Sequence, residues 1–149
     1  MKEITGDIWN VAKTIAGSTT LCITTNGVVG VDGAIMGKGI AMEARERYPD
    51  LPKLLGRKLE KHGNHVFHFP DKTLFTFPTK NHWRDDAVPD LIVQSALELR
   101  HFVDYTDSIY LHKIFLPRPG CGNGGLDWEK QVKPLIKDIL DDRFIIISK

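Results

Sequence analysis

Residues 21–41 read LCITTNGVVGVDGAIMGKGIA, and this stretch decides the fold class. Its first five residues are apolar or β-branched, which predicts a buried strand. Glycines then interrupt the chain as far as Gly39, and residues 40–48 predict a helix that Pro49 stops. A strand, a glycine-rich loop and a helix in this order are typical of an α/β unit.

The same alternation of short apolar runs and helical patterns continues to the end of the chain. We expect a helix over 52–61 with Gly63 as a left-handed cap, a strand pair over 65–69 and 73–78, irregular chain over 79–88, a helix from Pro89, a strand over 108–116, a loop over 117–125, a helix over 127–141 and a last strand over 144–147. This order predicts an α/β fold with a mixed, largely parallel sheet and helices on both faces. No linker divides residues 1–149, so we expect one domain.

Composition excludes several classes of protein. The 149 residues carry 20 basic and 19 acidic side chains, so no strong overall field favours nucleic acid or a membrane. The two cysteines, Cys22 and Cys121, lie far apart, and the first residues have no apolar signal pattern. The longest apolar runs are too short to cross a bilayer. We therefore expect a cytoplasmic monomer that does not contact membranes.

Two glycine-rich loops each follow a predicted strand and precede a predicted helix. Gly37, Lys38 and Gly39 can bring backbone N–H groups and a helix N-terminus toward an anion, although the loop is neither a Walker A motif nor a GxGxxG fingerprint. The second loop, 117–126, has four glycines within six positions. Either loop alone could be a tight turn, but ligands bind where parallel strands end. Two such loops at one sheet edge favour a diphosphate.

Four motifs along the chain follow the order found in the macrodomain family. They are Gly6-Asp7-Ile8, Thr25-Asn26, Gly37-Lys38-Gly39-Ile40-Ala41 and Gly120-Cys121-Gly122-Asn123-Gly124-Gly125-Leu126. Stretches 36–41, 78–84 and 122–128 resemble the branch that contains the DarG antitoxin and the terminal ADP-ribose glycohydrolase. The resemblance implies a three-layer α/β/α macrodomain with a central mixed sheet that binds ADP-ribose or an ADP-ribosylated macromolecule.

The resemblance also implies roles for individual residues. Asp7 would accept a hydrogen bond from the adenine amino group beside the Ile8 backbone, and Asn26 would hold the distal ribose during catalysis. Backbone amides of the two loops would wrap the diphosphate and distal ribose; the loop residues are Gly37, Lys38, Gly39, Ile40, Gly120, Cys121, Gly122, Asn123, Gly124, Gly125 and Leu126. We expect no cofactor and no metal.

Lys80, just after a predicted strand, is the candidate catalyst. The matching lysine of this branch is needed for hydrolysis and can attack the anomeric carbon of the distal ribose. We expect Lys80 to lie near backbone N–H dipoles, where its neutral amine would be a nucleophile. Without the resemblance, a loop lysine is more often a solvated surface charge.

Other residues admit two interpretations. The relative that cleaves carboxylate esters has a catalytic aspartate at the position of Gly124, whereas Asp127 here is expected to cap the next helix. His82, Trp83 and Arg84 could contact a nucleobase and its phosphate, or simply pack on an exposed loop. Trp128 and Cys121 are expected to fill the core. His62, His65 and His68 have no matching set of metal ligands.

Three functions are therefore open. The first is a lysine-dependent ADP-ribosyl glycohydrolase, for which the DarG resemblance suggests thymidine in single-stranded DNA as the acceptor. The second is a phosphatase for ADP-ribose 1''-phosphate, with His82, Asp85 or Asp86 activating water. The third is a reader that binds ADP-ribose without chemistry, because binding and catalysis share all contacts except those at the reacting carbon.

Overall fold

The structure of the protein is a computed structural model that describes residues 1–14, 19–108 and 111–149. The strands are β1 (Lys2–Thr5), β2 (Thr19–Thr25), β3 (Val29–Gly30), β4 (Gly33–Ala34), β5 (Phe67–Phe69), β6 (Leu74–Pro78), β7 (Lys113–Pro117) and β8 (Phe144–Ser148). The helices are α1 (Ile8–Thr14), α2 (Gly39–Arg47), α3 (Leu51–His62), the 3₁₀ turn η1 (Pro70–Lys72), α4 (Pro89–Asp104), the π-helical turn η3 (Trp128–Val132) and α5 (Lys133–Ile136). The predicted alternation of strands and helices is confirmed.

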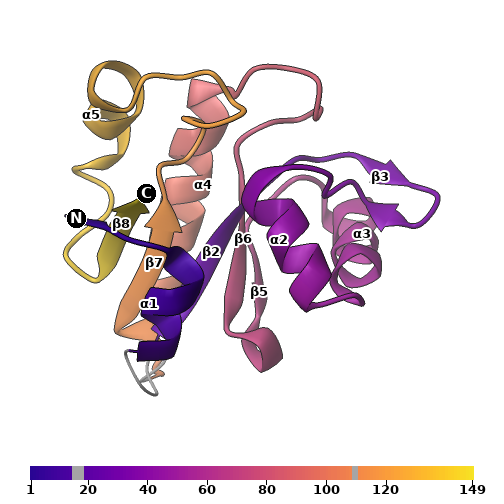
Figure 1. The fold of residues 1–149 in the computed structure, drawn as a ribbon, viewed down its shortest axis with the longest axis horizontal. Helices are drawn as coiled ribbons and strands as arrows, with labels where there is room; N and C mark the ends of the chain where they lie inside the picture. Colours follow the sequence, from indigo (N-terminus) through magenta and orange to yellow (C-terminus); the bar gives the residue numbers. More distant parts are fainter. Residues whose placement is uncertain (15–18, 109–110) are drawn as a thin grey trace.

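Six strands form one sheet in the order β1-β8-β7-β2-β6-β5 (Figure 1). Only β5 and β6 pair antiparallel, and the other four pairs are parallel. The turn between β5 and β6 is η1, whose sequence is Pro-Asp-Lys. The predicted mixed, largely parallel sheet is therefore correct, and the carboxyl ends of β1, β2, β6, β7 and β8 meet at one edge.

Alternating side chains of the central strands bury two apolar layers, one on each face of the sheet. Ile114 and Leu116 of β7 pack on one face with α4, η3 and α5, whereas Phe115 packs on the other with α2 and α3. All three side chains are fully buried. A parallel sheet is covered by helices on both faces, so successive side chains of its strands are buried on alternate faces. This pattern establishes the three-layer α/β/α arrangement.

The C-terminal helix differs from its predicted length of 127–141. It begins with the π-helical turn η3, in which the Val132 N–H donates to the Asp127 carbonyl at 3.2 Å, and α5 ends at Ile136. Pro134 has no N–H for the carbonyl of Lys130, so a regular α-helix cannot pass through it without losing a hydrogen bond. The widened turn is a consequence of that interruption.

Two other predictions, a strand boundary and a helix cap, differ from the structure, and one hairpin was not predicted. The strand predicted over 108–116 begins only at Lys113, after a turn in which Leu111 N–H donates to the Ser108 carbonyl at 3.1 Å; residues 109–110 lie outside the described chain. Gly63 ends α3 with φ 86° and ψ −170°, a positive φ but not a left-handed helical pair. The hairpin of β3 and β4 inside the first glycine loop was missed.

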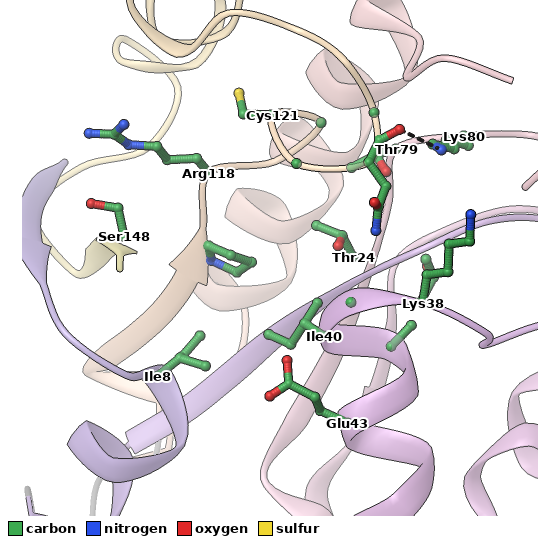
Figure 2. A pocket seen from close by; sticks show the side chains of 18 of the residues that line it. Ile8, Thr24, Lys38, Ile40, Glu43, Thr79, Lys80, Arg118, Cys121 and Ser148 are labelled. Atoms are coloured by element: carbon green, nitrogen blue, oxygen red, sulfur yellow. Dashed lines mark hydrogen bonds between the residues drawn. The ribbon is translucent and has the colours of Figure 1, made fainter.

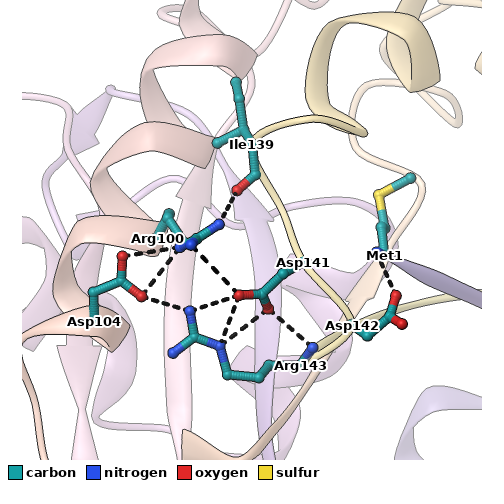
Figure 3. Close-up of polar contacts among 7 residues, drawn as sticks. All are labelled: Met1, Arg100, Asp104, Ile139, Asp141, Asp142 and Arg143. Atoms are coloured by element: carbon teal, nitrogen blue, oxygen red, sulfur yellow. Dashed lines mark hydrogen bonds and ion pairs between the residues drawn. The ribbon is translucent and has the colours of Figure 1, made fainter.

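A network of charged side chains joins α4 to the start of β8 (Figure 3). Arg143 donates to Asp141 at 2.8 Å and also pairs with Asp104, while Arg100 pairs with Asp104 at 2.9 Å. The hydrogen bonds from Arg143 lower the pKa of Asp141 and of Asp104 below their usual range.

None of the helices among the described residues is long and apolar enough to cross a lipid bilayer.

Candidate functional site

A cleft of about 770 Å³ opens where the parallel strands end (Figure 2). Its walls come from the residues that follow β1, β2, β6 and β7, together with the start of α2. The volume is within the range of small-molecule sites. Every predicted site residue lines this cleft except Gly125, where an added Cβ would lie 3.4 Å from the Asp86 carboxylate.

The first glycine loop supplies one wall. Gly39 begins α2 with φ 58°, a conformation that favours glycine. The side chain of Lys38 does not cap the helix, so the N–H groups of the first turn remain available to a ligand. Together with the helix dipole, these N–H groups have the geometry that suits an anion, so the anion site stays a prediction.

The second glycine loop faces the first. Gly120 and Gly125 have φ 78° and 77°, and the Leu126 N–H donates to the Gly120 carbonyl at 3.0 Å. Among the described residues, the N–H groups of Gly122, Asn123 and Gly124 have no acceptor. The loop therefore presents backbone donors to the cleft, which suits phosphate or ribose oxygens.

Gly124 leaves no room for a side chain. A Cβ there would lie 2.4 Å from the Gly120 carbonyl oxygen and 2.7 Å from the Ala87 Cβ. Asp127 accepts from the Lys130 N–H at 2.7 Å and so caps η3, as expected. An aspartate at position 124 is sterically incompatible with this loop, and the neighbouring Asp127 carboxylate is engaged in capping.

Asn26 lies at the end of β2, where its side chain holds the first loop. Its amide nitrogen donates to the Ile35 carbonyl and its oxygen accepts from the Val28 N–H, both at 2.9 Å. One N–H of the amide is left for the cleft, because only one of its two hydrogens is used. The structure thus gives Asn26 a role in shaping the loop that the sequence did not reveal.

Lys80 follows β6 and reaches the second glycine loop. Its Nζ donates to the Asn123 carbonyl at 3.1 Å and, at 3.5 Å, to the Trp83 carbonyl (Figure 2). Among the described residues, the backbone atoms that contact this amine are carbonyl oxygens. The expectation of N–H dipoles around Lys80 is therefore wrong. The contacts hold Nζ against the second glycine loop, in the cleft that both loops line.

Asp7 serves the helix that follows it. One carboxylate oxygen accepts from the Trp9 N–H at 2.9 Å and from the Asn10 N–H at 3.3 Å. The other oxygen has no partner among the described residues, and Asp7 is exposed at the cleft beside Ile8. Capping and the predicted adenine contact are therefore compatible.

Sequence analysis missed several lining residues. Glu43 points into the cleft from α2 (Figure 2) and accepts from the Trp9 indole at 3.2 Å. The Arg47 guanidinium lies 4.1 Å from the centre of the Trp9 ring. Arg118 and Ser148 line the same end. Of these residues, only Glu43 could have been predicted from the sequence, since it lies one turn into the helix that begins at the glycine loop.

Trp128 is part of the core as expected, whereas Cys121 is half-buried and lines the cleft, so it only packs against the core. Burial raises the pKa of the Cys121 thiol to about 11, so the thiolate is scarce at neutral pH. Trp128 is buried and donates to Glu3 at 2.7 Å.

The histidines named above are held by other contacts. His65 contacts Glu98 at 2.9 Å, and His68 stacks on Phe75 with 4.4 Å between ring centroids. Burial lowers the pKa of His68. No group of three or more metal-ligating side chains occurs in the described ranges.

The chain has the macrodomain fold. The macrodomain of Mycobacterium tuberculosis DarG superposes with a TM-score of 0.73 at 24% identity, over 99% of this chain and 97% of that one. The macrodomain of Thermus aquaticus DarG gives 0.71 at 22%, over 99% and 97%. A structure described as Thermosipho africanus DarTG in complex with ADP-ribose gives 0.72 at 22%, over 99% of this chain and 41% of that one.

Within that fold, the sequence is similar to the DarG branch. The DNA ADP-ribosyl glycohydrolase of Thermus aquaticus is 29% identical over 116 residues, which are 72% of this chain and 31% of the relative. The protein of the same name from Mycobacterium tuberculosis is 28% identical over 127 residues, 79% of this chain and 34% of the relative. The chain thus spans about a third of these relatives. No protein-family model matches it.

Proposed function

We propose that this chain is an ADP-ribosyl glycohydrolase, with Lys80 as nucleophile and thymidine in single-stranded DNA as the first acceptor to test. One observation carries the proposal: Lys80 Nζ is held 3.1 Å from the Asn123 carbonyl of the second glycine loop, in the cleft that both glycine loops line and in which they would enclose the distal ribose. The curated relatives are named DNA ADP-ribosyl glycohydrolases, which supports the same reaction with DNA as the acceptor.

In this scheme the glycine loops bind the diphosphate and fix the distal ribose against Lys80. The neutral amine bonds to the anomeric carbon as the bond to the acceptor breaks. The acceptor leaves with the electron pair and takes the proton released from Nζ. Water then replaces Nζ on the same carbon, which restores the lysine and frees ADP-ribose. A nucleophile splits one difficult substitution into two easier ones.

The test is release of ADP-ribose from thymidine-ADP-ribosylated single-stranded DNA, measured for the parent, for Lys80→Ala and for Lys137→Ala. Lys137 is an exposed lysine outside the cleft and serves as the control. We expect Lys80→Ala to lose about a hundredfold or more in turnover, as for removal of a group that acts on the reacting bond. Calorimetry should show that it still binds ADP-ribose.

The other functions predict different results. A phosphatase would release phosphate from ADP-ribose 1''-phosphate but leave the DNA linkage intact. A reader would bind ADP-ribose without multiple turnover on any acceptor. Equal turnover of Lys80→Ala and the parent would exclude the lysine mechanism. Faster release of ADP-ribose from ADP-ribosylated glutamate peptides than from the modified DNA would exclude DNA as the preferred acceptor.

We also propose that the chain acts as a monomer in the cytoplasm and needs no metal. The 149-residue chain should give a mass near 16.8 kDa by light scattering. Turnover should survive EDTA, since the proposed steps use only a lysine and backbone amides.

A further inference from the structure

An exposed group of flat side chains lies at the mouth of the cleft. It consists of His82, Trp83 and Arg84, here called the His82–Arg84 cluster. Trp83 lines the cleft and is 42% exposed. Most tryptophans bury more of their surface, so a ring left open beside a ligand cleft is a candidate contact surface.

The cluster is ordered by its own contacts. The His82 ring stacks on Trp83 with 5.4 Å between centroids and 27° between planes. The Arg84 guanidinium lies 4.7 Å from the centre of the Trp83 ring, and the Arg84 N–H donates to His82 Nδ1 at 3.1 Å. The three flat groups therefore form a preorganised stack, which lowers the entropy lost when another ring is added.

The loop that carries the cluster is fastened to the reacting end of the cleft. The Trp83 carbonyl accepts from Lys80 Nζ, and the Ala87 N–H donates to the Gly124 carbonyl at 2.9 Å. A molecule held by the cluster would therefore lie beside Lys80, on the acceptor side of the bond that the proposed reaction breaks.

Charge at this end of the cleft is suited to phosphate. Lys38 lies on the same side of the cleft as Lys80, and Arg84 is exposed on the cluster (Figure 2). The acidic side chains of the loop are Asp85 and Asp86, and Asp86 is turned toward Gly125. Aromatic faces interleaved with cations are the pattern that binds bases and phosphates of a single strand.

We propose that the His82–Arg84 cluster is an acceptor-side subsite for single-stranded nucleic acid. A base next to the modified nucleotide stacks on the cluster, and Arg84 pairs with a phosphate of the same strand. The position of the subsite beside the reacting carbon rests on the proposed function, but its affinity for an unmodified strand does not. An extended acidic peptide would pair with Arg84 but would add no ring to the stack of His82, Trp83 and Arg84.

The test is fluorescence anisotropy with an unmodified oligothymidine of about 12 nucleotides, enough to span such a site. It uses the full chain saturated with ADP-ribose, at low salt. We expect Trp83→Ala to weaken binding about five- to tenfold and Trp83→Phe to retain most of it, because base stacking needs an aromatic face. Tyr105→Ala is the control, since Tyr105 is an 81% exposed aromatic at the end of α4.

Arg84→Gln supplies a second measurement. It should reduce the slope of log affinity against log salt by about one, as expected for the loss of one phosphate contact. Calorimetry should give Arg84→Gln and Tyr105→Ala the parent's affinity for ADP-ribose, and each Trp83 variant is compared at its own saturating ADP-ribose concentration. The proposal falls if the parent does not bind the strand, if Trp83→Ala binds it as the parent does, or if Tyr105→Ala weakens binding equally. It also falls if a poly-glutamate peptide competes with the strand and depends equally on Trp83.

The outcome is separate from that of the lysine mechanism. Strand binding that depends on Trp83, together with unchanged turnover of Lys80→Ala, would keep the subsite and reject the mechanism. Lysine-dependent turnover with no role for Trp83 in strand binding would do the reverse.

Discussion

The side-chain amide of Asn64 donates to the backbone carbonyl of Lys80 at 2.9 Å and to the Asn81 side chain at 3.3 Å. Asn64 also packs against Gly27, whose N–H donates to the Asn81 carbonyl at 3.2 Å. Asn64 therefore fastens the chain at Lys80 to the loop that follows β2. Its Oδ1 is buried without a partner in the part of the chain that the structure describes.

Replacing this amide should impair catalysis more than ligand binding. We expect Asn64→Ala to lower kcat about tenfold with little change in the affinity for ADP-ribose, because displacement of a reacting group by about 1 Å can cost up to a hundredfold. Gln94→Ala, which removes an exposed amide from α4, is the control. A fall in affinity without a fall in kcat would show that Asn64 shapes the binding loop instead.

Two glycines of the second loop should differ in their tolerance of a methyl group. Gly124→Ala places Cβ against the Gly120 carbonyl and Ala87, whereas a Cβ at Gly122 meets nothing within 4 Å. We expect Gly124→Ala to cost about 1–3 kcal/mol of unfolding free energy and Gly122→Ala less than about 0.5 kcal/mol. Urea titration of both variants checks this, and equal midpoints would contradict the packing.

Asn26 should prove structural as well as functional. Asn26→Asp keeps an acceptor for the Val28 N–H but turns a carboxylate oxygen toward the Ile35 carbonyl, so we expect a loss of about 1–3 kcal/mol of stability. Turnover and ADP-ribose affinity should both fall because the loop loosens. Thermal unfolding and calorimetry measure the two effects. Parent-like stability with lost turnover would assign Asn26 to chemistry alone.

Acid should weaken the contribution of Arg143. Its partners Asp141 and Asp104 have lowered pKa values in the folded protein, so their stabilising effect is complete above their ordinary pKa and is lost as pH falls through the lowered values. Arg143→Gln should therefore destabilise the protein at neutral pH, and the difference from the parent should shrink below about pH 4.

The control for this change is Arg45→Gln, on the exposed face of α2. Urea midpoints across the pH range check the prediction. A difference between Arg143→Gln and the parent that stays constant from pH 7 to pH 3 would rule out the carboxylates as its cause. Added salt should also reduce the difference, because the network is partly exposed.

The sequence by itself determined the alternation of strands and helices and the edge at which the glycine loops meet. Residues 21–25 are β-branched and apolar, Pro89 starts a helix, and Gly39 opens one, so local propensities were sufficient there. Parallel strands then place both loops at one edge whatever the details of packing. The cleft and the two glycine loops that line it follow from these two facts, whereas Asp7, Asn26 and Lys80 were predicted from the resemblance to macrodomains.

Tertiary structure alone decided which partners those residues have. Lys80 contacts Asn123, 43 positions away, and Asn64 holds Lys80 from 16 positions away. The hairpin of β3 and β4 packs against α3, where Gly33 lies on the Pro52 carbonyl. Such contacts depend on the order of strands in the sheet and on the room that neighbouring side chains leave. Local sequence patterns predict neither the strand order nor this room, because both depend on the packing of segments that are distant in the chain.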